Sequence, residues 1–215
     1  MDYRQRITEE AANMFRTYGI RAVTMDMLAS QLGISKRTIY EIFRDKDELL
    51  QGVLKYMGEK QQEIIKKVFG ESENIVEAIF TLLDLMSAHF RKMSPAFKFD
   101  MEKYHYDILN TLKENDRMPY YIDNAEMLRR GIREGIFRND IDIDVTNNCI
   151  YGVMKLSVDK DKIGTGKLDK EILIKDFYLN YLRGISTSEG LRLIDFYEKN
   201  QKTNNQTDFL KDKLI

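Results

Sequence analysis

Apolar residues recur every three to four positions along almost the whole chain, and this spacing limits the possible folds more than any other feature. It places apolar side chains on one face of a helix, whereas a half-buried strand needs alternating apolar and polar residues. No sustained alternating segment occurs, and the only two prolines, Pro95 and Pro119, fall near expected helix starts, where a missing N–H costs little. The sequence therefore predicts an all-α protein.

Capping residues indicate where the first helices begin and end. Gly19 follows the apolar stripe of the first helix, and glycine readily adopts the positive φ found at helix C-termini. Thr24, Ser35 and Asp45 are good N-caps for the next three helices. We expect helices at residues 3–18, 24–32, 35–43, 46–68, 74–93, 95–115, 118–136, 144–160, 168–186 and 188–199, with loops at 70–72, 139–140 and 162–167.

The overall charge is close to neutral, with 34 basic and 35 acidic residues and a formal net charge of -1. Any nucleic-acid binding must therefore come from a local patch rather than from bulk attraction. Cys149 is the only cysteine, which excludes an intramolecular disulfide and fits a reducing compartment. We find neither the apolar run of a secretory signal nor a segment of roughly 20 apolar residues that could cross a membrane. We expect a cytoplasmic protein with no membrane partner.

The segment from residue 24 to residue 43 has the features of a helix-turn-helix. Two helices that cross closely need a small residue at the crossing, and Ala29 supplies it. The turn between them needs a positive φ, which Gly33 adopts at little cost. Ile39 and Phe43 have the spacing needed to fix the second helix against its neighbours. The order of small, glycine and apolar residues is that of a helix-turn-helix.

The other face of the second helix is the one that would meet DNA. Tyr40, Glu41 and Arg44 lie three, four and seven positions after Arg37. At this spacing the four side chains share one side of the helix. Long basic groups reach guanine edges or phosphates, and a tyrosine hydroxyl can donate to a phosphate oxygen. Glu41 is less expected, since a carboxylate repels phosphate unless it accepts from a cytosine amine. Lys36 and Thr38 lie in the first helical turn, where the helix N-terminus also attracts phosphate.

The first fifty residues resemble a known family. Residues 24–50, which end Tyr-Glu-Ile-Phe-Arg-Asp-Lys-Asp-Glu-Leu-Leu, resemble the signature of tetracycline-repressor-like (TetR/AcrR) regulators. The resemblance implies a three-helix DNA-binding domain followed by a larger helical domain for ligand binding and dimerisation. On this basis we expect a helix-turn-helix domain at 1–46 and a ligand-binding and dimerisation domain at 47–200. For the tail at 201–215 we make no structural prediction.

The resemblance also implies which residues meet DNA. Phosphate contacts are expected from Thr24, Lys36, Tyr40 and the helix N-terminus at Lys46, and base contacts from around Arg37 and Thr38. Glu41 departs from the aromatic or histidine residues that often occur at its position, which leaves the base specificity open. The full set of expected DNA contacts is Thr24, Ser35, Lys36, Arg37, Thr38, Tyr40, Arg44 and Lys46.

Two later helices are candidates for a dimer interface. The helix near 144–160 has an apolar face left over after packing inward, and the helix near 168–186 is apolar almost all round, which is typical of burial on several sides. Together with their copies they would form a four-helix interface in a twofold homodimer. A twofold dimer would read palindromic operator DNA.

The helices between these regions are rich in methionine and aromatic residues. Such residues usually fill a core, but the family resemblance implies a pocket for a small apolar or aromatic effector. The residues that we expect to line it are Met86, His89, Phe90, Phe97, Met101, Tyr104, Tyr121 and Met154.

Enzyme chemistry has little support in the sequence. His89 and His105 are the only histidines and belong to no metal-binding motif, and neither a phosphate-binding loop nor a nucleophile elbow is present. We therefore expect no enzyme activity, no cofactor and no metal. The preferred function is a ligand-responsive transcriptional regulator, most often a repressor in this family. The alternative is a dimeric DNA-binding regulator without an effector. A solvent-accessible cavity would favour the ligand-responsive regulator, and a fully packed core would favour the alternative.

Overall fold

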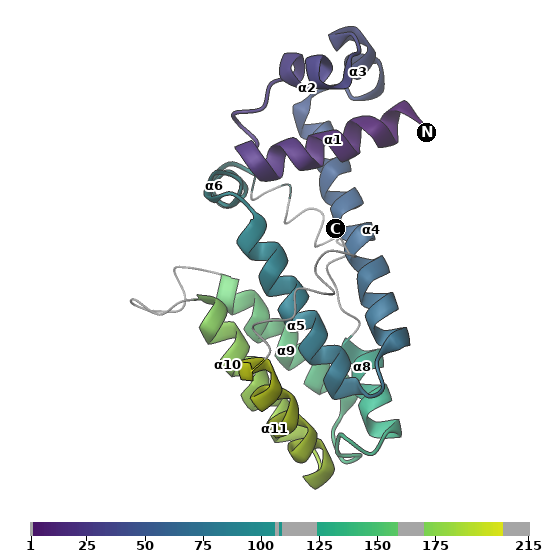
Figure 1. Cartoon of the computed structure of the whole chain (residues 1–215), viewed down its shortest axis with the longest axis vertical. Helices are drawn as coiled ribbons and strands as arrows, with labels where there is room; N and C mark the ends of the chain where they lie inside the picture. The colour runs from purple at the N-terminus through teal and green to yellow at the C-terminus, as the bar shows by residue number, and fades with distance from the viewer. Residues whose placement is uncertain (1, 106–107, 109–123, 159–169, 204–215) are drawn as a thin grey trace. The chain divides into compact units, whose positions relative to one another are not determined.

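The computed structural model describes residues 2–105, 108, 124–158 and 170–203, and the regular elements within these ranges are helices (Figure 1). The all-α prediction is therefore confirmed. In chain order the helices are α1 (Tyr3–Tyr18), α2 (Met25–Leu32), α3 (Lys36–Ile42), α4 (Lys46–Glu71), α5 (Ile75–Lys92), α6 (Pro95–Tyr104), α8 (Asn124–Arg133), α9 (Ile143–Val158), α10 (Lys170–Ile185) and α11 (Ser188–Thr203).

Side-chain caps start several of these helices. The carboxylate of Asp2 accepts a hydrogen bond from the backbone of Arg4 at the start of α1. The hydroxyl of Ser94 accepts from the backbone of Phe97 and so caps α6, whose first residue is Pro95. Such caps satisfy backbone N–H groups that have no partner within the helix.

Some helix ends differ from the expected ones. The helix expected to end at residue 68 continues to Glu71, so Gly70 lies within α4 and not in a loop. The reason is local, because both the backbone N–H and the hydroxyl of Ser72 donate to the carbonyl of Val68 and cap this end. The helix expected at 95–115 ends at Tyr104, and α11 runs past residue 199 to Thr203. The loop expected at 162–167 and residues 118–123 lie outside the described ranges.

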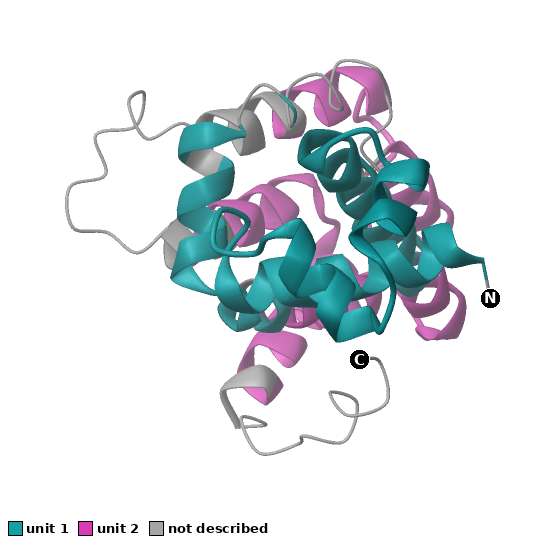
Figure 2. Cartoon of the chain, turned by 90° about the horizontal axis from the view of Figure 1, so that it is seen from above, with its two compact units in different colours: residues 1–65, 88–122 teal, residues 66–87, 123–215 magenta. Residues whose placement is uncertain are grey.

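The chain divides into two compact units, each built from two stretches of sequence (Figure 2). Unit 1 consists of residues 1–65 and 88–122, and unit 2 consists of residues 66–87 and 123–215. The domain boundary expected near residue 46 stays a prediction.

Unit 1 has one continuous hydrophobic core. Its fully buried side chains come from all of the first four helices and include Phe15 of α1, Leu28 of α2, Ile39 of α3 and Leu50 of α4. Burying a side chain of this size stabilises a fold by about 1.5–3 kcal/mol. The core therefore fixes the short helices α2 and α3 against the longer helices α1 and α4.

Unit 2 is held together by an arginine at the centre of a polar network. The guanidinium of Arg130 in α8 donates to the carbonyl of Phe69 at 2.6 Å and to that of Ser72 at 2.9 Å. It also pairs with Glu134 at 2.6 Å, and Glu134 in turn accepts from the backbone N–H of Ile75 at 2.7 Å. One side-chain pair thus satisfies backbone groups at the end of α4 and at the start of α5.

A close contact in unit 2 depends on a glycine. The backbone N–H groups of Ile136 and Phe137 both donate to the carbonyl of Gly131, which folds the segment after α8 back onto the helix. The ring of the buried Phe137 then lies where a side chain at position 131 would be, since an added Cβ would come within 2.0 Å of it.

We predict that Gly131→Ala lowers the free energy of unfolding by roughly 2 kcal/mol, because the ring of Phe137 must move out of its site. Gly70→Ala is the matched control: Gly70 is also helical, but an added Cβ would meet no atom within 4 Å. The control should gain up to about 1 kcal/mol from the better helix propensity of alanine. Denaturant unfolding followed by circular dichroism measures both variants. Equal stability of Gly131→Ala and the wild type would contradict this account.

Candidate nucleic-acid interface

The turn between α2 and α3 has the geometry that its sequence predicts. Gly33 adopts the left-handed conformation with φ 65°, and the backbone N–H of Ile34 reaches back to the carbonyl of Ala29 at 3.0 Å. This hydrogen bond closes the C-terminus of α2. The next residue, Ser35, is the N-cap of α3. The two helices are in contact through this tight connection, which confirms the predicted helix-turn-helix.

The outer face of α3 presents long polar side chains to solvent. Ile39 is fully buried on the inner face, whereas the Arg37 side chain is 88% exposed and the Tyr40 residue 46% exposed. Arg44, two residues beyond the end of α3, is also exposed. The structure therefore brings Arg37, Tyr40 and Arg44 to the surface, as the spacing predicts.

Each exposed cation at this surface pairs with a carboxylate in the free protein. Lys36 binds Asp26 at 2.7 Å, and this hydrogen bond raises the pKa of the lysine. The other two pairs are Arg37 with Glu41 at 2.9 Å and Arg44 with Asp45 at 2.9 Å. Exposed pairs of this kind contribute little stability and are screened by salt. The cations can therefore exchange these carboxylates for phosphate at little cost.

Two of the expected hydroxyl contacts, Thr24 and Ser35, belong to helix caps. The hydroxyl oxygen of Thr24 accepts from the backbone of Met27 at 3.2 Å, and that of Ser35 accepts from the backbone of Thr38 at 3.1 Å. The hydroxyls of Ser35 and Thr38 also share a hydrogen bond of 2.8 Å. A hydroxyl that accepts in a cap keeps its own O–H for donation.

Lys46 differs from the other expected contacts because its ammonium is directed into unit 1. It donates to the backbone carbonyl of Val23 and lies 5.9 Å from the centre of the Phe15 ring. Burial lowers the pKa of this lysine. In this structure Lys46 ties the start of α4 to the loop before α2.

Two arginines of α1 hold the ends of the short helices, which sequence reasoning missed. Arg6 donates to the carbonyl of Leu32 at the end of α2, and Arg4 donates to that of Ile42 at the end of α3, both at 2.8 Å. Cations are stabilising at helix C-termini, where backbone carbonyls lack partners. A signal was present in the sequence, since both arginines lie on the amphipathic first helix.

Helix α6 is attached to the same unit by polar bonds. The buried carboxylate of Asp100 accepts from the backbone N–H of Arg21 at 2.8 Å, and the backbone N–H of Ser94 donates to the carbonyl of Arg16 at 3.0 Å. The guanidinium of Arg21 also lies 4.3 Å from the centre of the Tyr104 ring. Sequence reasoning missed Asp100, because the charged residues Lys98, Glu102 and Lys103 lie close to it and the local pattern does not mark it as buried.

Comparison with known proteins agrees with this geometry. The sequence model described as "Bacterial regulatory proteins, tetR family" matches residues 7–53, the segment that contains the helix-turn-helix. Residues 7–53 of the chain are therefore similar to the tetR family of bacterial regulatory proteins. This family consists of transcriptional regulators.

The chain is also similar to individual HTH-type transcriptional regulators. It is 32% identical over 93 residues to the uncharacterised HTH-type transcriptional regulator YhgD of Bacillus subtilis, an alignment that covers 41% of this chain and 49% of YhgD. It is 24% identical over 201 residues to the HTH-type transcriptional repressor KstR2 of Mycolicibacterium smegmatis, covering 87% of this chain and 92% of KstR2. The chain thus spans about half of the first relative and most of the second.

Solved structures share the fold. The transcriptional regulator FadR from Bacillus subtilis, in complex with stearoyl-CoA, superposes with a TM-score of 0.57 at 18% identity. The match covers 84% of this chain and 98% of FadR.

The residues expected to line an effector pocket are only partly described, and those that are lie in different environments. Phe97 and Met101 are buried in the core of unit 1, where they pack with the first four helices. His89 is partly buried, and Tyr104 is exposed. The side chains of Met86, Phe90, Tyr121 and Met154 lie outside the described part of the chain.

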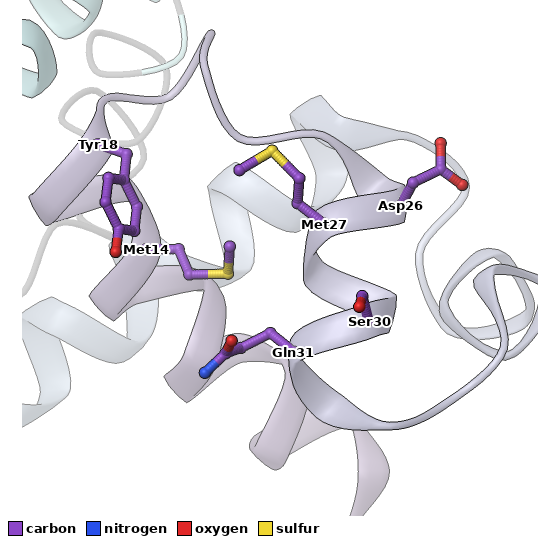
Figure 3. A pocket seen from close by; sticks show the side chains of 6 residues that line it. All are labelled: Met14, Tyr18, Asp26, Met27, Ser30 and Gln31. Carbon is purple, nitrogen blue, oxygen red and sulfur yellow. The ribbon is translucent and has the colours of Figure 1, made fainter.

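An open depression occurs elsewhere on unit 1, between α1 and α2 (Figure 3). It has a volume of about 480 Å³ and shares no residue with the expected effector pocket. Its lining consists of Met14, Tyr18, Asp26, Met27, Ser30 and Gln31.

No cluster of three or more His, Cys, Asp or Glu side chains within the described ranges could hold a metal ion. No helix in the described part of the chain is long and apolar enough to cross a membrane.

We predict that His89 contributes to a loss of stability in mild acid. Burial lowers its pKa from the ordinary 6.5, and the charges of Arg16 and Lys92 lower it further. The unfolded chain takes up this proton near the ordinary pKa, whereas the folded chain does so only at lower pH. Stability is therefore fully present above the ordinary pKa and falls as the pH drops below it. Between about pH 7 and about pH 5, His89→Gln should lose less thermal stability than the wild type. Identical losses in the two proteins would contradict this assignment.

Proposed function

We propose that this chain is a homodimeric repressor of the TetR family that binds palindromic operator DNA through α3 and is released by a small apolar or aromatic effector. The observation that carries the proposal is the exposed cationic and aromatic face of α3, held in place by the capped turn at Gly33 and Ser35. A helix presented in this way can enter the major groove.

Both kinds of DNA contact are available near α3. Lys36 and Arg44 can neutralise phosphates, and the Tyr40 hydroxyl can donate to a phosphate oxygen. Arg37 and Thr38 lie in the first helical turn, from which recognition helices read base edges. The relative KstR2 is named a transcriptional repressor, and this supports the same role here.

The dimer part of the proposal rests on exposed apolar side chains of α9 and α10, two helices that are in contact in unit 2. Val145 in α9 is 59% exposed and Phe177 in α10 is 39% exposed. Burying such side chains against a second copy is favourable. A twofold pair of α3 helices would then read two half-sites of a palindrome.

The effector part of the proposal rests on α6 and on the chemistry bound by proteins of this fold. FadR of Bacillus subtilis was solved with stearoyl-CoA, a ligand with a long apolar chain. In the present chain the bonds of Asp100 and Ser94 attach α6 to the end of α1. An effector that favours a different position of α6 would therefore shift the population of the DNA-binding form.

A second candidate function is a dimeric DNA-binding regulator without an effector. It is favoured by Phe97 and Met101, two expected pocket residues that pack in the core of unit 1. Thermal stabilisation by acyl-CoA or phenolic compounds, together with release of DNA, would favour the effector-responsive form.

We predict that the double variant Lys36→Ala/Tyr40→Ala binds DNA at least about tenfold more weakly than the wild type, because two phosphate contacts are lost. The slope of log affinity against log salt should also become shallower by about one, since one charge no longer displaces a counterion. Mobility-shift titrations against duplex DNA flanking the protein's own gene, at several salt concentrations, measure both effects.

The matched control is Lys55→Ala, which removes an exposed lysine of unit 1 that also pairs with a carboxylate. It should leave both the affinity and the salt slope close to those of the wild type. Wild-type binding no tighter than that of the double variant would contradict DNA recognition through α3.

We predict that Val145→Glu/Phe177→Glu converts the dimer to a monomer, because charges would replace apolar side chains in the proposed interface. Sedimentation equilibrium measures the mass, and circular dichroism checks that the helices remain. Phe196→Glu in α11 is the control, because Phe196 is also exposed but lies outside α9 and α10. Retention of the dimer by the double variant, or equal dissociation of the control, would place the interface elsewhere.

A further inference from the structure

Phosphate binding does not explain the pair that Arg37 forms with Glu41 on α3. Both side chains are exposed, Arg37 at 88% and Glu41 at 59%, and the Nε of Arg37 donates to a carboxylate oxygen of Glu41 at 2.9 Å. A carboxylate on a face that approaches DNA is repelled by phosphate, so its presence there needs a compensating role.

Glu41 differs from the other two carboxylates of this surface. Asp45 accepts from the backbone of Glu48 and caps α4, and Asp26 lies in the first turn of α2, where an acidic residue is favourable. Glu41 caps no helix and is not part of the core. In the described part of the chain, its partner is Arg37.

The bond through Nε leaves a defined edge of the guanidinium for another partner. Arginine carries five N–H donors in a planar fork, and the two terminal nitrogens together form a second two-donor edge. Among the described residues, these terminal nitrogens of Arg37 donate to no protein acceptor. Guanine presents two acceptors, O6 and N7, side by side in the major groove, and arginine is the residue that most often binds both.

We propose that Glu41 is a positioning residue that holds the Arg37 guanidinium by its Nε edge, so that the terminal nitrogens bind O6 and N7 of one guanine in each operator half-site. This inference rests on the proposed DNA-binding function and adds its base specificity. The carboxylate restricts a long side chain before binding, which reduces the ordering cost when the base is reached. The role is specific to guanine, because no other base offers two acceptors at this edge.

The experiment begins with selection of bound sequences from a pool of random duplexes by the full-length wild type. Each enriched guanine is then replaced in turn by 7-deazaguanine, which keeps base pairing but removes the N7 acceptor. At one guanine of each half-site, this replacement should weaken wild-type binding by about tenfold or more. Discrimination is the ratio of the affinities for the two duplexes at that position.

The variants separate positioning from simple charge effects. Arg37→Ala should lose the discrimination. In Glu41→Ala the discrimination ratio should fall several-fold, whereas the affinity for random-sequence DNA should be at least as high as that of the wild type. Glu41→Gln should recover part of the discrimination, because its amide oxygen can still accept from Nε. The double variant Arg37→Ala/Glu41→Ala should discriminate no worse than Arg37→Ala alone. Glu59→Ala, which breaks another exposed i,i+4 pair of unit 1, should keep the wild-type discrimination.

Each contrary result has a distinct meaning. If the wild type enriches no sequence, the proposed DNA-binding function fails and this inference fails with it. Full discrimination by Glu41→Ala would show that the pair is an ordinary surface ion pair, with DNA binding intact. Equal sensitivity of Arg37→Ala and the wild type to 7-deazaguanine would show that Arg37 does not read this base.

Discussion

The exposed face of α3 depends on a helix that could not persist alone. With only seven residues, α3 is far shorter than the roughly 12–15 residues at which isolated helices become marginal in water. Its position comes from the burial of Ile39 in the core of unit 1, from the Ser35 cap at its start and from Arg4 at its end. The groups that would meet DNA are thus placed largely by contacts on the other face and at the two ends of the helix. This arrangement puts the side chains of a recognition surface on a rigid support.

The sequence was most informative where local chemistry decides the structure. Gly33 adopts the positive φ that the turn requires, and Ile39 and Phe43 are buried as their spacing predicts. The exposed positions of Arg37 and Tyr40 follow from the same register. For such features a few neighbouring residues contain the necessary information, because caps, turns and helical faces are set within one or two turns of the chain.

Contacts between distant parts of the sequence could not be predicted in this way. Asp100 accepts from Arg21, which lies 79 positions earlier, and Arg6 reaches a carbonyl 26 positions later. The ammonium of Lys46 bonds to Val23, 23 positions earlier, and the DNA contact expected at Lys46 stays a prediction. Phe97 packs in the core of unit 1, and its expected role in an effector pocket stays a prediction. Periodicity identifies an apolar or polar face but not the element that will cover it.

The attachment of α6 has a consequence for how the chain acquires its structure during synthesis. The family signature ends near residue 53, yet the core beneath it is completed by Phe97 and Met101, and the Arg21 amide obtains its partner only from Asp100. A nascent chain that has just exposed its helix-turn-helix therefore lacks part of that core. Domains fold as units, and the N-terminus of a chain is synthesised first. The core beneath the recognition surface can therefore be completed only after a length of chain about twice that of the family signature has left the ribosome.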